Sequence, residues 1–362
     1  MTTTTAKRPH FPALDGLRGV ACILVVLYHN FPALHEYLFF GWLAMDIFFV
    51  LSGYLITDIL IHTIGTENFL KNFYVRRSLR VFPLYFTSMI LFFIVLPWLI
   101  RFPFPIDYFI NNQIYYWTFL QNWLLILHPH PTQSYLNHLW SMAVEEQFYL
   151  LWPFLFIAIR KPRPLLALLA ALLIAFNILR FGLWITHLEG FNYYSFFSFT
   201  RIDGICIGCM VALLQKLNTD FIGKHTAVIV LFFAAINFIF YLINLRYADT
   251  FPYILVGYST FSMVFGLLVY DLVNRRTKIF EMLLSLSFLR FFGMISYGTY
   301  IFHWPLYLLI SPWLTSWAVS HMPQFPAALF ASLTATLLAF FIGYVSYRFF
   351  EMRFLRMKKY FA

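Results

Sequence analysis

Long apolar blocks alternate with short polar and basic stretches along the whole chain. The blocks are about twenty residues long, which is the length that an α-helix needs to cross the hydrocarbon core of a bilayer. They predict an all-α fold: a polytopic integral membrane helical bundle of about ten transmembrane helices. The expected spans cover residues 14–34, 41–62, 79–100, 138–159, 164–186, 200–217, 226–245, 252–273, 290–314 and 325–349.

One apolar segment is too short to count among these spans. Residues 114–127, IYYWTFLQNWLLIL, include Gln121 and Asn122 in a run of only about fourteen residues. Aromatic residues of this kind are typical of the level of the lipid headgroups. We therefore interpret the segment as an additional short re-entrant or interfacial piece.

Composition supports a membrane protein. Of the 362 residues, 61% are hydrophobic and only 11% are charged, whereas about a quarter of the residues of a soluble protein are charged. We expect a single membrane domain over residues 1–362, with a cytoplasmic tail at 1–13, a helical bundle at 14–349 and a basic cytoplasmic tail at 350–362. The N-terminus shows no small-residue cleavage site, so we expect it to be retained.

The net charge of +10 does not indicate a nucleic-acid partner. With an even number of spans, nearly all Lys and Arg residues fall in loops and tails on one side. The positive-inside rule places that side, and both termini, in the cytoplasm. The three cysteines lie in apolar segments, and Gly204 and Gly208 bracket Cys206 and Cys209 as a small-residue packing pattern. We expect no metal site there.

Two polar residues stand out in the first span, GLRGVACILVVLYHN. Charged side chains inside a bilayer are costly and therefore mark functional sites. Arg18 and His29 are eleven residues apart, which returns a helix to within about 20° of its starting direction and separates the two by about 16 Å along the axis. A neutral imidazole can accept a proton from a hydroxyl group, so His29 is a candidate general base.

Further polar residues follow the helical period in two later spans. The fourth span has a polar stripe made of His138, Ser141, Glu145 and Tyr149. The ninth span carries Tyr300 and His303. Counting the rise along each helix predicts that His29, Glu145 and His303 lie at one depth and share one cavity. A carboxylate such as Glu145 could then orient the imidazole, although the sequence does not identify which carboxylate reaches it.

Other candidates support binding or charge stabilisation. Arg77 and Arg80 share a helix face at the start of the third span and suit a phosphate-bearing ligand. A tetrahedral oxyanion needs a hydrogen-bond donor, and side chains that suit an oxyanion or acceptor contact are Ser52, Trp140, Ser141 and Tyr300. In the second span we expect Asp46 near the outer end, where it can face water, and Gly53 at a close helix contact.

These motifs together resemble the membrane acyltransferase family 3, polytopic enzymes that O-acylate bacterial surface polysaccharides and some secreted small molecules. The resemblance rests on LDGLRG with its R-x10-H spacing, DIFFVLSGYLIT, the RxxR of Arg77 and Arg80, HLWSMAVEEQFYLLWP and SYGTYIFHWP. It implies a cytoplasmic acyl-coenzyme A donor, with acetyl-CoA favoured, His29 as catalytic base and Arg18 as a donor-site residue. Arg77 and Arg80 would bind the phosphates of coenzyme A.

The resemblance also implies a partner and a location. The acceptor would be a hydroxyl of a cell-surface or exported glycan, such as a polysaccharide, a lipopolysaccharide or a lipid-linked saccharide, and the enzyme would lie in a bacterial inner membrane. Some family members carry an extra extracytoplasmic hydrolase-like domain, whereas this chain ends at Ala362. We therefore expect it to act alone or with a partner in glycan assembly.

Alternatives remain open from the sequence. A secondary transporter or a flippase of a glycan precursor would also place charged residues in its helices. A small-molecule O-acyltransferase or an inactive scaffold for glycan assembly would show the same motifs. Within the acyltransferase interpretation, direct transfer and an acyl-enzyme relay are both compatible with the residues.

Overall fold

The structure is a computed structural model that describes residues 10–38, 41, 43–103, 106–128, 135–186, 193, 196–246 and 257–361. All regular elements in these ranges are helical, so the predicted all-α class is confirmed for the described part of the chain. Most of the expected N-terminal tail, residues 1–9, lies outside it. The residues expected as a basic tail continue as helix up to Phe361.

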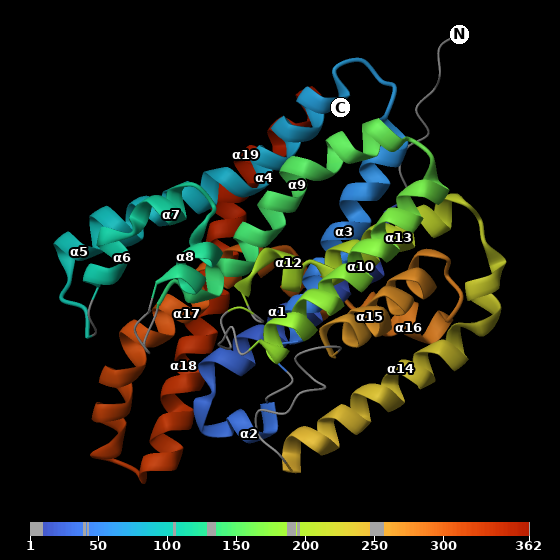
Figure 1. Ribbon diagram of the computed structural model, residues 1–362. Helices are drawn as coiled ribbons and strands as arrows, with labels where there is room; N and C mark the ends of the chain where they lie inside the picture. The colour runs from blue at the N-terminus through green and yellow to red at the C-terminus, as the bar shows by residue number, and fades with distance from the viewer. Residues whose placement is uncertain are drawn as a thin grey trace. The chain divides into compact units, whose positions relative to one another are not determined.

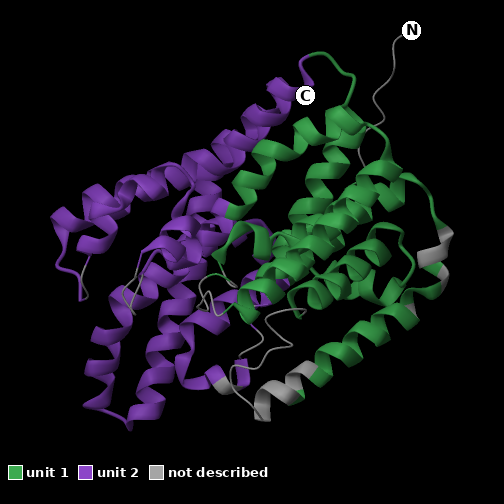
Figure 2. Ribbon diagram, viewed as in Figure 1, with its two compact units in different colours: residues 1–18, 45–67, 144–290 green, residues 19–44, 68–143, 291–362 purple. Residues whose placement is uncertain are grey.

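The chain forms two compact units that alternate along the sequence (Figure 2). The first comprises residues 1–18, 45–67 and 144–290, and the second comprises residues 19–44, 68–143 and 291–362. Four helices contribute residues to both units: α1 (Pro12–Asn30), α3 (Ala44–Thr63), α9 (Trp140–Ile159) and α17 (Ser287–Val319). Of α3, only the first residue, Ala44, falls in the second unit.

The remaining elements each belong to one unit, and Figure 1 labels their α-helices. The first unit contains α10 (Pro162–Ile185), α12 (Ser198–Arg201), α13 (Asp203–Lys216), α14 (Asp220–Arg246), α15 (Tyr258–Val273) and α16 (Lys278–Leu284). The second unit contains η1 (Pro32–Leu34), α2 (His35–Leu38), α4 (Phe69–Ile90), the π-helix η3 (Leu91–Val95), α5 (Leu96–Leu99), α6 (Asp107–Asn111), α7 (Gln113–Trp117), α8 (Gln121–Leu127), η4 (Asn137–Leu139), α18 (Gln324–Val345), the π-helix η6 (Ser346–Glu351), α19 (Met352–Met357) and η7 (Lys358–Phe361).

Several helices are long and apolar enough to cross a membrane. Among the described residues there are 6, or up to 7 if α16 and α17, which meet at a bend of 59°, form one broken span. The prediction of a polytopic membrane bundle is supported, but the expected number of about ten spans is not confirmed. One reason is α13, which fills an expected span with a helix of only 14 residues.

The short apolar segment expected at the interface is divided into two helices, α7 and α8. Phe119, between them, adopts a left-handed conformation with φ 55°. Neither helix is long enough to cross a bilayer. Gln121, which opens α8, donates from its amide Nε2 to the carbonyl oxygen of Leu139 at 2.8 Å, and this bond ties the segment to the start of α9.

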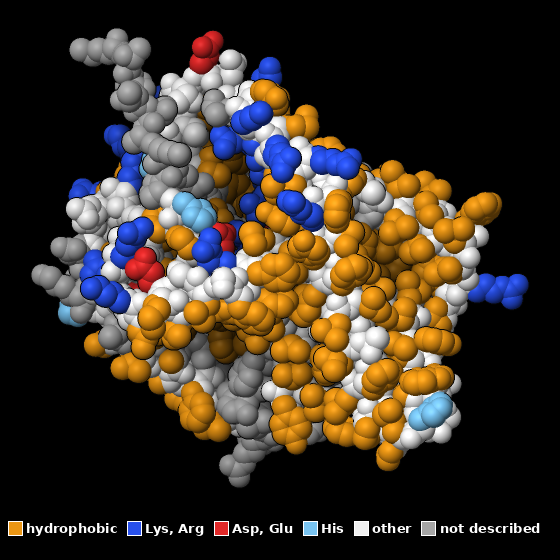
Figure 3. Space-filling view, turned by 180° about the vertical axis from the view of Figure 1, so that it is seen from behind, with side chains coloured by type: hydrophobic (Ala, Val, Ile, Leu, Met, Phe, Trp, Pro, Cys, Tyr) orange, Lys and Arg blue, Asp and Glu red, His pale blue; other side chains and the backbone are white. Residues whose placement is uncertain are grey.

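Hydrophobic side chains cover much of the surface in Figure 3. Helix α18 shows how the sequence produces such a surface. One face exposes the large side chains Leu333, Leu337 and Phe341. The opposite face buries alanines at every fourth position: Ala327, Ala331, Ala335 and Ala339. A helix with this pattern suits lipid contact on one side and close helix packing on the other.

Glycines allow α3 and α13 to approach closely in the first unit. A Cβ at Gly53 would overlap the carbonyl oxygen of Ile205, and a Cβ at Gly208 would overlap that of Val50. The predicted packing role of these glycines is confirmed. Cys206 and Cys209 lie buried on α13.

Two buried ion pairs also lie in the first unit. Arg180 Nη2 contacts Asp203 Oδ2 at 2.7 Å, and Arg201 Nη2 lies 3.5 Å from Asp46 Oδ1. The Arg201 guanidinium also stacks on the ring of Tyr258, 3.6 Å from its centroid. The expectation that Asp46 faces water is wrong, because its exposure is 0%. An arginine from another helix compensates a carboxylate that would otherwise be too costly to bury.

Candidate active site

Two histidines from distant parts of the chain meet in the second unit. His29, in the last turn of α1, and His303, midway along α17, are joined by a hydrogen bond of 2.8 Å between Nδ1 and Nε2. His303 is fully buried, whereas His29 is only partly buried. The structure therefore brings together two of the three residues that depth counting placed in one cavity.

Hydrogen bonding fixes the tautomers of this pair. His303 Nδ1 lies 2.7 Å from the carbonyl oxygen of Tyr300. A carbonyl can only accept, so Nδ1 of His303 carries the proton, and the Nε2 of the neutral ring is an acceptor. It follows that His29 donates from Nδ1 to His303. The remaining nitrogen of His29, Nε2, then holds an unshared electron pair, which is the form that a general base requires.

A third histidine, His138, packs against the pair. Its ring lies edge-on to that of His303, with 5.1 Å between centroids. His138 donates from Nε2 to the carbonyl oxygen of Ile301 at 3.2 Å. That carbonyl is available because Pro305, four residues later on α17, has no N–H to complete the helical bond. The sequence showed His138 only as part of a polar stripe.

Ser141 and Tyr300 hold this histidine in place. The Tyr300 hydroxyl donates to the carbonyl oxygen of His138. Ser141 Oγ lies 2.7 Å from the same hydroxyl and, because the tyrosine proton is already used, acts as the donor. Both hydroxyl protons are thus directed to partners within the site. This arrangement favours a supporting role over the oxyanion or acceptor contact that the sequence suggested for these two residues.

Three histidines in one place raise the question of a metal. No group of three His, Cys, Asp or Glu side chains in the described part of the chain converges on a point where an ion could sit. Two of the three imidazoles donate to backbone carbonyls, and these bonds fix which ring nitrogen carries the proton.

Contacts between helices fix the position of His29. Its neighbour Asn30 donates from Nδ2 to Thr336 Oγ1 on α18 at 3.1 Å, so the end of α1 is fastened to a second helix. Helix α18 in turn packs tightly on α17, because a Cβ at Gly343 would overlap Thr299. The three helices that define the site therefore hold one another at fixed distances.

Two aromatic rings lie close to the His29 ring. The ring centroids of Tyr28 and Trp304 lie 5.2 and 5.4 Å from that of His29. His35, on α2, stacks on Tyr28 at 4.5 Å. Partial burial lowers the pKa of His35, because desolvation disfavours its charged form. The charged form of this histidine is therefore disfavoured.

Glu145 belongs to the first unit and lies in the second turn of α9. Its Oε1 accepts from Ser52 Oγ at 2.8 Å, and its Oε2 accepts from the Tyr149 hydroxyl at 3.2 Å. Ser52 thus donates to a carboxylate rather than to the backbone of its own helix. At Nδ1 of His29, where a carboxylate was the expected partner, the structure has the imidazole of His303.

The arginines expected to hold the donor occupy α1 and α4. Arg18 forms an ion pair with Asp15 one turn earlier, at 3.5 Å, and its side chain is 14% exposed. On α4, Arg77 is half-buried and Arg80 is exposed. Arg80 interacts electrostatically with Glu351. Trp140 is the first residue of α9. The donor-site roles of the arginines and the oxyanion role of Trp140 stay predictions.

Comparison with known families agrees with this site. The sequence profile of the family described as "Acyltransferase domain" matches residues 11–345, which include every candidate residue above. The chain belongs to this acyltransferase family. The resemblance inferred from the motifs is confirmed, and the match runs through both compact units.

Curated relatives include peptidoglycan O-acetyltransferase OatA of Listeria monocytogenes, which is 28% identical over 86% of this chain and 51% of its own length. O-acetyltransferase OatA of Staphylococcus aureus is 27% identical over 94% of this chain and 57% of its own. The chain therefore spans about half the length of the curated relatives it matches. No solved structure gives a significant match.

Proposed function

We propose that this protein is a membrane O-acetyltransferase that moves an acetyl group from cytoplasmic acetyl-coenzyme A to a hydroxyl of an extracytoplasmic glycan, with His29 as general base. Membership of the acyltransferase family supports the reaction class. The names of the relatives make peptidoglycan the first acceptor to test. The observation that carries the proposal is the tautomer of the partly buried His29, which leaves its Nε2 unprotonated.

The chemistry follows from that tautomer. Nε2 of His29 takes the proton of the acceptor hydroxyl as its oxygen attacks the thioester carbonyl carbon. The tetrahedral intermediate then collapses, the carbon–sulfur bond breaks, and the departing thiolate receives the proton from His29. Acetyl is thereby transferred directly and the base is regenerated. Holding both substrates in one site supplies up to about 7 to 11 kcal/mol of such catalysis.

His303 acts as a positioning residue in this scheme. Its Nε2 accepts from Nδ1 of His29 throughout the reaction, so the base cannot rotate or exchange its tautomer. When His29 becomes an imidazolium, the same bond becomes charge-assisted and stronger. A neutral imidazole thus serves here where a carboxylate serves in hydrolase triads.

A turnover assay tests the proposal. Purified protein in liposomes is supplied with acetyl-CoA and a peptidoglycan fragment, and coenzyme A release and the acetylated glycan are measured. We expect acceptor-dependent release that His29→Ala abolishes. His321→Ala is the matched control, because this exposed histidine lies just beyond the end of α17, and it should retain activity. Movement of solute without donor consumption would instead support a transporter, and full activity of His29→Ala would refute the assigned base.

A further inference from the structure

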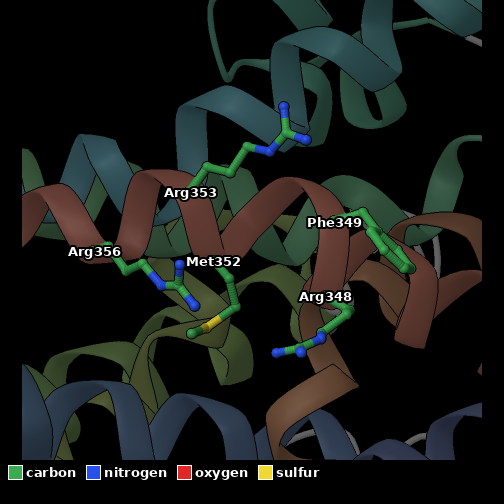
Figure 4. A pocket seen from close by; sticks show the side chains of 5 residues that line it. All are labelled: Arg348, Phe349, Met352, Arg353 and Arg356. Carbon is green, nitrogen blue, oxygen red and sulfur yellow. The ribbon is translucent and has the colours of Figure 1, made fainter.

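The C-terminal helical segment forms a basic pocket. Arg348, Phe349, Met352, Arg353 and Arg356 line a pocket of about 260 Å³ in the second unit (Figure 4). All three arginines are exposed. Within the described part of the chain, the structure gives none of them an ion pair or a hydrogen bond. Three guanidinium groups around one space repel one another unless an anion neutralises them.

Helical spacing explains the arrangement. Arg348, Met352 and Arg356 recur every four residues and extend to the same side of the helix (Figure 4). Arg353 extends from the other edge of the helix in this view. The pocket begins in the π-helix η6, where the N–H of Met352 bonds the carbonyl of Tyr347 five residues earlier. Such π-turns occur frequently at functional sites.

The chemistry of the lining selects the ligand class. Guanidinium groups present planar pairs of donors that match phosphate oxygens, and they bind phosphate more specifically than lysine does. The side chains of Phe349 and Met352 add an apolar wall beside the charges. The lining therefore suits a ligand with several phosphate groups next to a flat or apolar moiety.

The position of the pocket relative to His303 is set by α17. A Cβ at Gly298 would lie 3.0 Å from Glu351 Oε1 and from Ser346, so η6 crosses α17 at this residue. Gly298 precedes His303 by five residues, or about 8 Å of helix. From this crossing, the segment from Arg348 to Arg356 runs away from His303 and covers about 12 Å of helix. The guanidinium groups thus lie roughly 8 to 20 Å along the helices from the level of His303.

This separation matches the reach of a coenzyme A thioester. Its pantetheine arm is about as long as four residues of extended chain, or roughly 14 Å. We propose that the pocket holds the phosphate groups of the acyl-coenzyme A donor, so that the arm delivers the thioester to His29. The inference rests on the proposed function and deepens it. Helix α4, with Arg77 and Arg80, packs against η6 and α19 and contributes basic side chains nearby.

A binding and kinetic experiment tests the pocket. The combined Arg348→Ala, Arg353→Ala and Arg356→Ala variant is compared with Arg101→Ala, an exposed arginine that follows α5 in the same unit. We expect the triple variant to raise KM for acetyl-CoA and Kd for coenzyme A by about tenfold or more, with kcat little changed. Arg101→Ala should leave both constants unchanged. Replacing the same three residues by lysine should give an intermediate effect, because charge remains without the bidentate geometry.

A second arm identifies the source of the phosphate. Wild-type protein should bind coenzyme A more tightly than 3′-dephospho-coenzyme A, and the triple alanine variant should lose that difference. The same variants are placed in nanodiscs of phosphatidylcholine with or without phosphatidylglycerol. If only the response to phosphatidylglycerol changes, the pocket binds lipid headgroups, and the assignment to the donor is overturned.

Failure of the two proposals can be told apart. If wild-type protein turns over acetyl-CoA but the triple alanine and lysine variants match Arg101→Ala in KM and Kd, the pocket assignment is wrong and the proposed function stands. Suppose instead that wild-type protein binds coenzyme A without turnover and that the triple alanine variant does not bind it. The pocket is then supported and the proposed reaction is not. Unchanged thermal unfolding of the lysine variant separates loss of binding from loss of fold.

Discussion

Substitution of His303 tests how the base is held. Asparagine and glutamine each retain one of the two hydrogen-bonding functions of the imidazole. His303→Asn keeps a donor near the position of Nδ1, which bonds the Tyr300 carbonyl, but removes the acceptor from Nδ1 of His29. His303→Gln places an amide oxygen near the position of Nε2 and so keeps that acceptor. The two variants therefore separate the orientation of His29 from other consequences of losing the buried ring.

The expected size of the effect follows from the lost hydrogen bond. A donor left without its partner costs about 1 to 3 kcal/mol. If His29 needs this bond to keep its reactive orientation in the transition state, kcat of His303→Asn should fall by about 5- to 160-fold, since 1.36 kcal/mol corresponds to a factor of ten. His303→Gln should stay within about fivefold of wild type, because its acceptor is retained.

The assay is acetyl transfer from acetyl-CoA under saturating donor and acceptor, so that kcat is measured. Thermal unfolding of both variants controls for the packing of a fully buried side chain. An asparagine variant as active as wild type would refute the positioning role. A glutamine variant as inactive as His29→Ala would show that His303 must itself take up a proton, which the scheme of direct transfer does not include.

Three further predictions concern the packing around the site and within the first unit. Pro305→Ala returns an N–H to the Ile301 carbonyl, which then competes with His138, and we expect kcat to fall by about fivefold while the thermal unfolding temperature rises. Asp203→Asn leaves the Arg180 guanidinium without its charged partner and should lower the unfolding temperature by an amount equivalent to about 3 to 5 kcal/mol; an unchanged temperature would contradict the buried pair. Gly208→Val should prevent α13 from packing on α3 and abolish folded, monodisperse protein, whereas Gly182→Ala, with no atom near its Cβ, should purify normally.

The sequence predicted helices well where the apolar run is uninterrupted. Spans expected at 41–62 and 164–186 are present as α3, Ala44–Thr63, and α10, Pro162–Ile185. The same pattern overestimated the number of full spans. Apolar composition reports burial from water, whereas the length of a helix depends on where its backbone turns, as at the short α13.

The core of the site could be predicted from the sequence in part. The meeting of His29 and His303 could be predicted, because both residues lie on long, regular helices along which depth can be counted from the sequence. The hydrogen bond between His138 and Ile301 could not be found in that way, although Pro305 in the sequence signals an open carbonyl four residues earlier. Pairings that join different helices, such as Arg201 with Asp46, depend on tertiary packing that no local pattern reports.

The arginines of the C-terminal segment show a different limit. In the sequence Arg353 and Arg356 form part of the predicted basic tail, where the positive-inside rule alone explains them, and Arg348 falls at the end of the last expected span. The structure continues the helix through this segment and gathers Arg348, Arg353 and Arg356 around one pocket. Charge counting reports the sign of a segment, but the ligand it can hold depends on the directions of its side chains.

The protonation of His29 is the most direct test of the account. In protein with ¹⁵N-labelled histidine, imidazole nitrogen shifts at neutral pH distinguish a protonated from an unprotonated ring nitrogen, and the His29→Gln and His303→Gln variants assign the signals. We expect both His29 and His303 to carry the proton on Nδ1 and to have an unprotonated Nε2. A proton on Nε2 of His29 in the resting enzyme would contradict it, because the nitrogen assigned as the base would then have no electron pair to offer.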